Sequence, residues 1–178
     1  MSNELLNPRT ALWPASLGLG TVLGSWALAC VFPFAAFAAL AALTMDRRTG
    51  LALLATVWAA NQAVGFFVLS FPWELQAFGH GIAILAATLA GFGAARFVSA
   101  RMGSNALLRS ITALVSAFAV YEVVLLAYAQ VGGGAENFTL EIVRDIAVND
   151  GLWFAGLMAL RFALSQVTGE RALLSVAR

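Results

Sequence analysis

Apolar residues fill six segments of this chain, and short polar or glycine-containing stretches separate them. A membrane-spanning helix needs about 20 mostly apolar residues, and most of the segments reach that range. They are Trp13–Cys30, Pro33–Met45, Leu51–Phe71, Gly79–Val98, Ala106–Gln130 and Ile142–Gln166. The pattern predicts an all-α, polytopic membrane protein of six transmembrane helices, built as one integral membrane domain over residues 1–178.

Pro33 makes the second segment shorter than the others. Proline removes a backbone donor and disfavours helix in the residue before it. Residues 13–45 therefore form either two short helices that meet in a tight turn or one kinked helix. We favour two helices, because an even number of spans gives a consistent distribution of charge.

The composition supports a membrane protein and excludes several functions. The chain is 61% hydrophobic and 11% charged, with a mean hydropathy of +0.87, whereas soluble domains are about 45–50% apolar and roughly 25% charged. A net charge of +1 offers no basic surface for nucleic acid. A single cysteine excludes an internal disulfide framework and a multi-cysteine zinc site. No sequence motif of a soluble enzyme is present, and we expect no enzymatic activity.

All ten cationic residues are arginines, and six spans would place nine of them on one side of the membrane. The opposite side would receive only Arg144. Loops rich in arginine lie in the cytoplasm. We therefore expect a multi-pass protein of the bacterial cytoplasmic membrane with both termini inside.

Polar residues inside the predicted spans gather in the outer half of the bilayer. Ionisable groups at that depth are costly and usually face a cavity or a partner. We expect an outward-facing pocket with Asn61 and Gln62 as its floor and further lining from His80, Tyr121, Glu122, Asn149 and Asp150. The alternative for Glu122 is a structural ion pair or polar network.

His80 is the only histidine of the chain, and it stands between Gly79 and Gly81. The two glycines would let a large flat ligand approach closely, and Trp73 and Phe78 would add aromatic surface. A purely local hydrogen bond is the alternative role for this imidazole. One histidine cannot build a protein-only transition-metal site. It can supply one axial bond to a metal already held in a macrocycle, such as haem or a corrinoid.

Small residues recur every fourth position on several predicted helices. Ala83, Ala87, Gly91 and Ala95 do so on the fourth span, Ser16, Gly20 and Gly24 on the first, and Ala35/Ala39 and Ala38/Ala42 on the second. Such stripes let helix backbones approach closely in lipid. We expect most of them to serve internal packing, and docking of a separate membrane subunit is the alternative.

The stretch "WELQAFGHG", residues 73–81, together with the small-residue helix faces near the N-terminus and six short spans, resembles the substrate-binding S-components of energy-coupling-factor (ECF) transporters. Within that group the chain resembles the BtuM-type cobalamin transporters. The resemblance implies capture of cobalamin at the extracytoplasmic face for uptake. It also implies contacts with an ECF coupling subunit and its ATPases through the alanine-rich helix faces.

In that family a cysteine near the start of this helix binds the cobalt of cobalamin, and the family is associated with thiolate-dependent removal of cyanide. His80 stands at the matching position. The resemblance therefore implies that His80 is the axial cobalt ligand. An imidazole lacks the anionic sulfur that favours removal of cyanide, so we do not expect that chemistry.

Two other functions stay open at this point. The chain could be a haem-binding or redox membrane subunit, although membrane haem is commonly held by paired histidines and this chain has one. It could also be a structural helix-packing partner that binds no small ligand.

Overall fold

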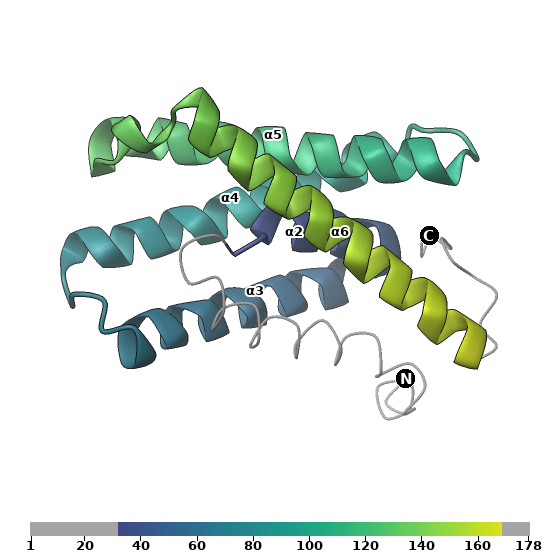
Figure 1. Ribbon diagram of the computed structural model, residues 1–178, viewed down its shortest axis with the longest axis horizontal. Coiled ribbons are helices and arrows are strands. Elements are labelled where there is room, and N and C mark those ends of the chain that lie inside the picture. The colour runs from purple at the N-terminus through teal and green to yellow at the C-terminus, as the bar shows by residue number, and fades with distance from the viewer. Residues whose placement is uncertain (1–31, 169–178) are drawn as a thin grey trace.

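The computed structural model describes residues 32–168, and this part of the chain is entirely helical (Figure 1). The predicted span Trp13–Cys30 lies outside the described residues. The helices are α2 (Phe34–Thr44), α3 (Arg47–Ala63), the π-helix η1 (Val64–Val68), α4 (Leu75–Ser99), α5 (Ala106–Gly132), the 3-10 turn η2 (Ala135–Asn137) and α6 (Leu140–Thr168).

Four of these helices are long and apolar enough to cross a membrane: Arg47–Val68, Leu75–Ser99, Ala106–Gly132 and Leu140–Gln166. They match the last four predicted spans to within a few residues. α2 has 11 residues, and at 1.5 Å per residue it is only about 16 Å long. It is therefore too short to cross the roughly 30 Å hydrocarbon core by itself.

α2 is the buried centre of the bundle. Its side chains from Phe34 to Leu43 are almost completely inaccessible, and α3, α4, α5 and α6 all contact it. A helix that is apolar on every face belongs inside a protein. Alanines at six of its positions keep the helix thin, so that four longer helices can pack around it.

Charged side chains from other helices bind both ends of α2. The Asp150 carboxylate, on α6, accepts a hydrogen bond from the backbone N–H of Ala36 at 2.6 Å. The Arg96 guanidinium, on α4, donates to the carbonyl of Met45 at 2.9 Å. A helix has a partial positive charge at its N-terminus and a partial negative charge at its C-terminus. Both side chains therefore carry the sign that stabilises the helix end they contact.

α4 and α5 form the closest helix pair, along the predicted small-residue stripe. Ala87, Gly91 and Ala95 are buried on α4, and Ala113 and Ala117 are buried on α5. A Cβ at Gly91 would lie 2.9 Å from the backbone oxygen of Ala117. On α4, the stripe therefore serves internal packing, as the sequence predicts.

The helices place four of the seven arginines of residues 32–168 at one end of the bundle. α3 begins, α4 ends and α5 begins at this end, which carries Arg47, Arg48, Arg101 and Arg109; in Figure 1 it is on the right. We call it the arginine end. At its edge Asp46 caps α3, and the hydrogen bond from the Thr49 hydroxyl lowers the pKa of Asp46 below its usual value.

Candidate functional site

A cavity of about 610 Å³ lies at the end of the bundle opposite the arginine end. It is bounded by the first turns of α4, the second half of α5, η2 and the start of α6. Its polar lining comes from His80, Tyr121, Glu122, Tyr128 and Asn137. The remaining lining is apolar apart from the backbone of Gly133 and Gly134.

His80 projects from α4, and both of its ring nitrogens face backbone carbonyls. Nδ1 is 2.8 Å from the oxygen of Gln76, one turn earlier on the same helix. Nε2 is 3.2 Å from the oxygen of Gly133, which follows α5. A neutral imidazole has one N–H group and one lone pair. We assign the proton to Nδ1, which makes the shorter contact, so the lone pair is on Nε2.

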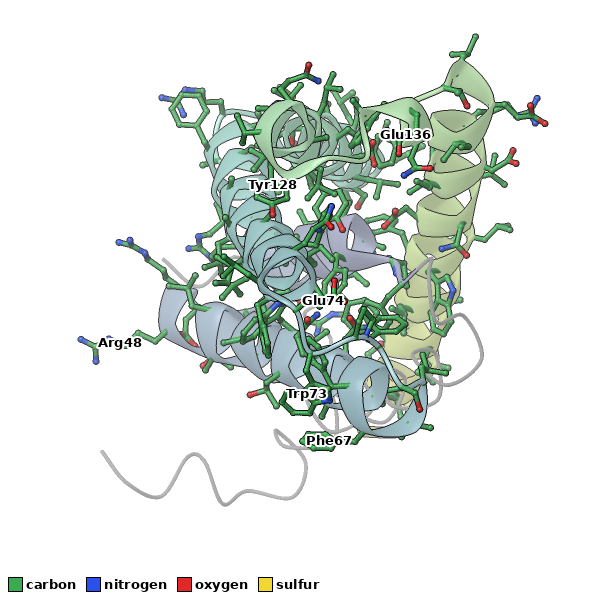
Figure 2. All side chains as sticks on the ribbon, turned by 90° about the vertical axis from the view of Figure 1, so that its left-hand side faces the viewer. Arg48, Phe67, Trp73, Glu74, Tyr128 and Glu136 are labelled. Atoms are coloured by element: carbon green, nitrogen blue, oxygen red, sulfur yellow. The ribbon has the colours of Figure 1, made fainter. Side chains whose placement is uncertain are left out.

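Tyr128 fixes the plane of the His80 ring. The two rings meet edge to face, with centroids 5.1 Å apart and planes at 83°. Tyr128 extends from α5 toward α4 (Figure 2), and its hydroxyl occupies the space that a side chain at Gly79 would need. Gly79 therefore makes room for the residue that orients the imidazole.

Tyr121 and Glu122 bring the second half of α5 into the cavity. Tyr121 is buried and stacks on Phe34 at a centroid distance of 6.4 Å. Glu122 is half-buried, and its Oε1 has no hydrogen-bond partner among residues 32–168. The Glu122 side chain therefore lines the cavity with one of its two carboxyl oxygens buried and without a partner.

Gly81, Asn61 and Gln62 do not line the cavity. The side-chain oxygen of Gln62 occupies the space beside Gly81, where a Cβ would overlap it. The indole of Trp58 donates to the Gly81 carbonyl at 2.7 Å. Gly81 thus allows α3 and α4 to pack closely, and Gln62 is part of that contact.

Trp73, on the connection between η1 and α4, forms an aromatic cluster with Phe66 and Phe67 of η1 and Phe78 of α4. Phe66 stacks on Phe78 at 4.8 Å, and Trp73 meets Phe66 at 5.1 Å. Trp73 and Phe67 lie together at the edge of the molecule (Figure 2). Neither Trp73 nor Phe78 lines the cavity.

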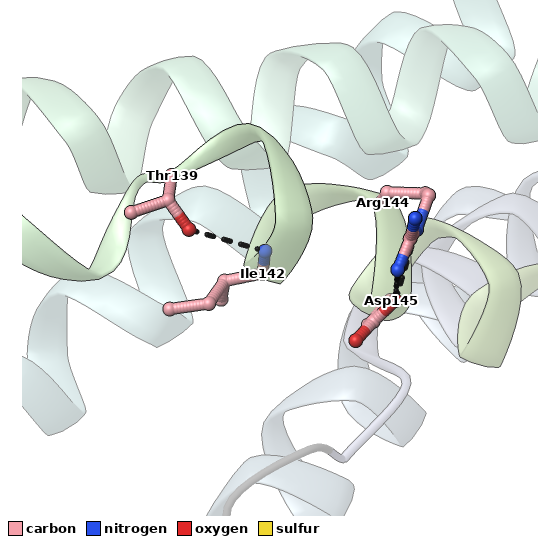
Figure 3. Close-up of polar contacts among 4 residues, drawn as sticks. All are labelled: Thr139, Ile142, Arg144 and Asp145. Carbon is pink, nitrogen blue, oxygen red and sulfur yellow. Dashed lines mark hydrogen bonds and ion pairs between the residues drawn. The ribbon is translucent and has the colours of Figure 1, made fainter.

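The polar residues of α6 that the sequence singled out lie outside the main cavity, in three different places. Asp150 is 2% exposed and caps α2, while Asn149 lines a separate cavity of about 410 Å³ with Trp153 and Leu157. Arg144 and Asp145 form an exposed ion pair at 2.9 Å (Figure 3). One turn earlier, at the start of α6, the Thr139 hydroxyl accepts a hydrogen bond from the backbone N–H of Ile142.

Sequence reasoning brought His80, Tyr121 and Glu122 to one cavity and missed Tyr128, Asn137 and the glycines after α5. Tyr128 follows Tyr121 by seven residues, which is two helical turns, so it lies on the same face of α5. That spacing could have predicted that Tyr128 lines the same cavity as Tyr121. Asn137 and the glycines stand in a loop whose position depends on tertiary contacts, so no periodicity could reveal them.

The described residues contain no group of three or more histidine, cysteine, aspartate or glutamate side chains that could hold a metal ion. Comparison with protein-family models, curated proteins and solved structures gives no match for this chain. The function must therefore be argued from the cavity itself.

Proposed function

We propose that this membrane protein binds a corrinoid, of the cobalamin type, in the cavity at the end opposite the arginines and takes it up across the bacterial cytoplasmic membrane. The positive-inside rule makes the arginine end cytoplasmic, so the cavity opens to the outside. Inward release would depend on ATP-hydrolysing partner chains of the ECF type. Nothing in this role requires the protein itself to catalyse a reaction.

The observation that supports this proposal is the position of His80. Its Nδ1 is held by the carbonyl of Gln76, and a hydrogen bond at one ring nitrogen leaves the other as the metal donor. Nε2 faces the cavity side of α4, where the loop after α5 contacts it. A metal bound in a macrocycle needs only this one donor to complete an axial position.

The other polar groups of the cavity suit the periphery of a corrinoid. A corrin ring carries amide side chains, which both donate and accept hydrogen bonds. Glu122 supplies acceptors, Asn137 supplies both kinds of group, and Tyr121 and Tyr128 supply hydroxyls. Trp73, Phe78, Asn61, Gln62, Asn149 and Asp150 lie outside this cavity, so in this conformation we do not include them in the proposed site.

The test is to purify the protein from cells supplied with aquocobalamin and to record its absorption spectrum and corrinoid content. We expect a coloured protein with stoichiometric corrinoid and, when cobinamide, which lacks the nucleotide base, replaces cobalamin, a spectrum of cobalt with an axial nitrogen ligand. His80→Ala should lose that spectrum and lower the affinity by at least about tenfold, the scale reached when a group supporting a metal ligand is removed. Thr112→Val is the matched control, because within residues 32–168 its hydroxyl bonds to carbonyls of α5 itself.

A colourless wild-type protein that takes up no corrinoid would refute the proposal. A haem-type Soret band would instead assign the cavity to haem and the protein to a redox function. Equal corrinoid affinity in the wild type and in His80→Ala would show that the imidazole is not the cobalt ligand.

A further inference from the structure

We infer that Gln76 is a positioning residue that holds the loop of residues 132–134 closed over the empty cavity, and that a ligand bound to His80 displaces this loop. The inference rests on the proposed function, because it concerns access to the same cavity. It gives the space next to His80 Nε2 two alternative occupants, the Gly133 carbonyl in the empty protein and the cobalt in the loaded protein.

Two contacts join the start of α4 to the loop. The Gln76 side-chain amide donates to the carbonyl of Gly132 at 3.0 Å, and the Nε2 of His80 lies 3.2 Å from the carbonyl of Gly133. Gln76 and His80 are one turn apart on the same face of α4. The carbonyls of Gly132 and Gly133 therefore lie against adjacent turns of one helix.

The two contacts differ in strength. The Gln76 amide always has protons to donate, so its contact is a hydrogen bond. With the His80 proton on Nδ1, the Nε2 contact brings a lone pair toward a carbonyl oxygen and contributes no hydrogen bond. The Gln76 contact therefore holds the loop, and the Gly133 carbonyl occupies the position from which a metal would approach Nε2.

The loop has the backbone freedom to move. Gly133 and Gly134 have φ angles of 84° and 95°, a region that other residues rarely adopt. They follow the last turn of α5 directly and precede η2. Gly132 is the last residue of α5, so release of its carbonyl from Gln76 frees this helix end, and a change at Gly133 and Gly134 then moves the residues that follow it.

The size of the cavity requires such a movement. Drug-sized ligands occupy cavities of about 300–1,000 Å³, and a complete cobalamin, with its amide chains and nucleotide, is larger than a drug. The cavity measures about 610 Å³. The closed loop therefore belongs to the empty protein, and binding selects an open form whose population limits the apparent affinity.

The first experiment compares hydrogen exchange of the ligand-free wild type, Gln76→Leu and Gln76→Glu in detergent. Glutamate keeps the size of glutamine and, when ionised, cannot donate to Gly132. The amides of Gly133 and Asn137 report on the loop, because they donate to Ala129 and Gly134. Both variants should exchange about two- to tenfold faster there, the factor that corresponds to one hydrogen bond. Gln130→Leu is the control, because in the described part of the chain the Gln130 amide donates to Leu126 of the same helix.

The second experiment measures aquocobalamin binding by stopped-flow absorption. Because Gln76 holds only the empty form closed, Gln76→Leu should raise the association rate about two- to tenfold, leave the dissociation rate unchanged and tighten binding by the same factor. The spectrum of the bound cobalt should stay that of the wild type.

Unchanged loop exchange in both Gln76 variants would overturn the inference, and so would weaker binding or stronger loop protection after aquocobalamin is added to the wild type. A wild-type protein that binds no corrinoid would refute the proposed function. In that case the exchange of the ligand-free variants would still decide whether Gln76 holds the loop.

Discussion

Asp150 is the most buried acidic side chain of the described residues, and its role is structural. Its carboxylate accepts from the N–H of Ala36, a residue 114 positions away in the sequence, and it is 2% exposed. The first N–H groups of any helix lack partners within the helix, and at the start of α2 water cannot supply one. Asp150 therefore stabilises the central helix.

We predict that Asp150→Ala lowers the free energy of unfolding by about 1–3 kcal/mol, because it leaves a buried N–H without an acceptor. Asp150→Asn should cost less, since its amide oxygen still accepts. Thermal unfolding in detergent, followed by circular dichroism, measures both. Asp145→Ala is the control, because its ion pair with Arg144 is exposed and exposed pairs contribute little. Equal losses in the two Asp150 variants would contradict the capping role.

The residues of the site show what a single sequence can predict. The position of Glu122 and Tyr121 within an apolar segment was sufficient to predict that they face the interior, because lipid excludes such groups. The same reasoning placed Asp150 in the pocket, because hydropathy cannot distinguish a residue that lines a cavity from one that caps a helix. That distinction depends on α2 and α6 meeting in space.

At the scale of helices, hydropathy predicted four long spans closely, because the bilayer requires long uninterrupted apolar segments. It also predicted the short segment Pro33–Met45, close to the 11 residues of α2, but it could not predict that this helix lies in the centre of the bundle. The two interactions that fix this short helix, with Asp150 and Arg96, come from helices later in the chain. Periodicity within residues 33–45 contains no information about them.

The α4–α5 contact supplies a prediction with a control on the same helix. Gly91→Ala should lower stability by about 1–3 kcal/mol, the usual cost of overpacking, because its Cβ would meet the Ala117 backbone oxygen at 2.9 Å. A backbone atom cannot move without moving α5. Gly93→Ala should cause no loss, because nothing lies within 4 Å of a Cβ there. Thermal unfolding of the two variants measures both changes. Similar losses of stability in Gly91→Ala and Gly93→Ala would contradict the packing argument.

At the scale of the whole molecule, the direction of binding depends on which end of the bundle faces outward. α3 and α5 run from the arginine end toward the cavity, and α4 runs back (Figure 1). The connection between α4 and α5 therefore lies at the arginine end, and the connection between α5 and α6 lies beside the cavity. These two connections must be on opposite sides of the membrane.

Cysteine labelling in intact cells tests that orientation. In a Cys30→Ala background, which removes the only native cysteine, we predict that a membrane-impermeant maleimide modifies Glu136→Cys and does not modify Gly103→Cys until the membrane is opened. Both positions are exposed in the structure, so a difference in labelling reports sidedness rather than burial. Arginine-rich loops remain cytoplasmic, so we expect the position at the arginine end to be the protected one. The reverse pattern would direct the cavity inward, and capture of a ligand from outside the cell would then be impossible at His80.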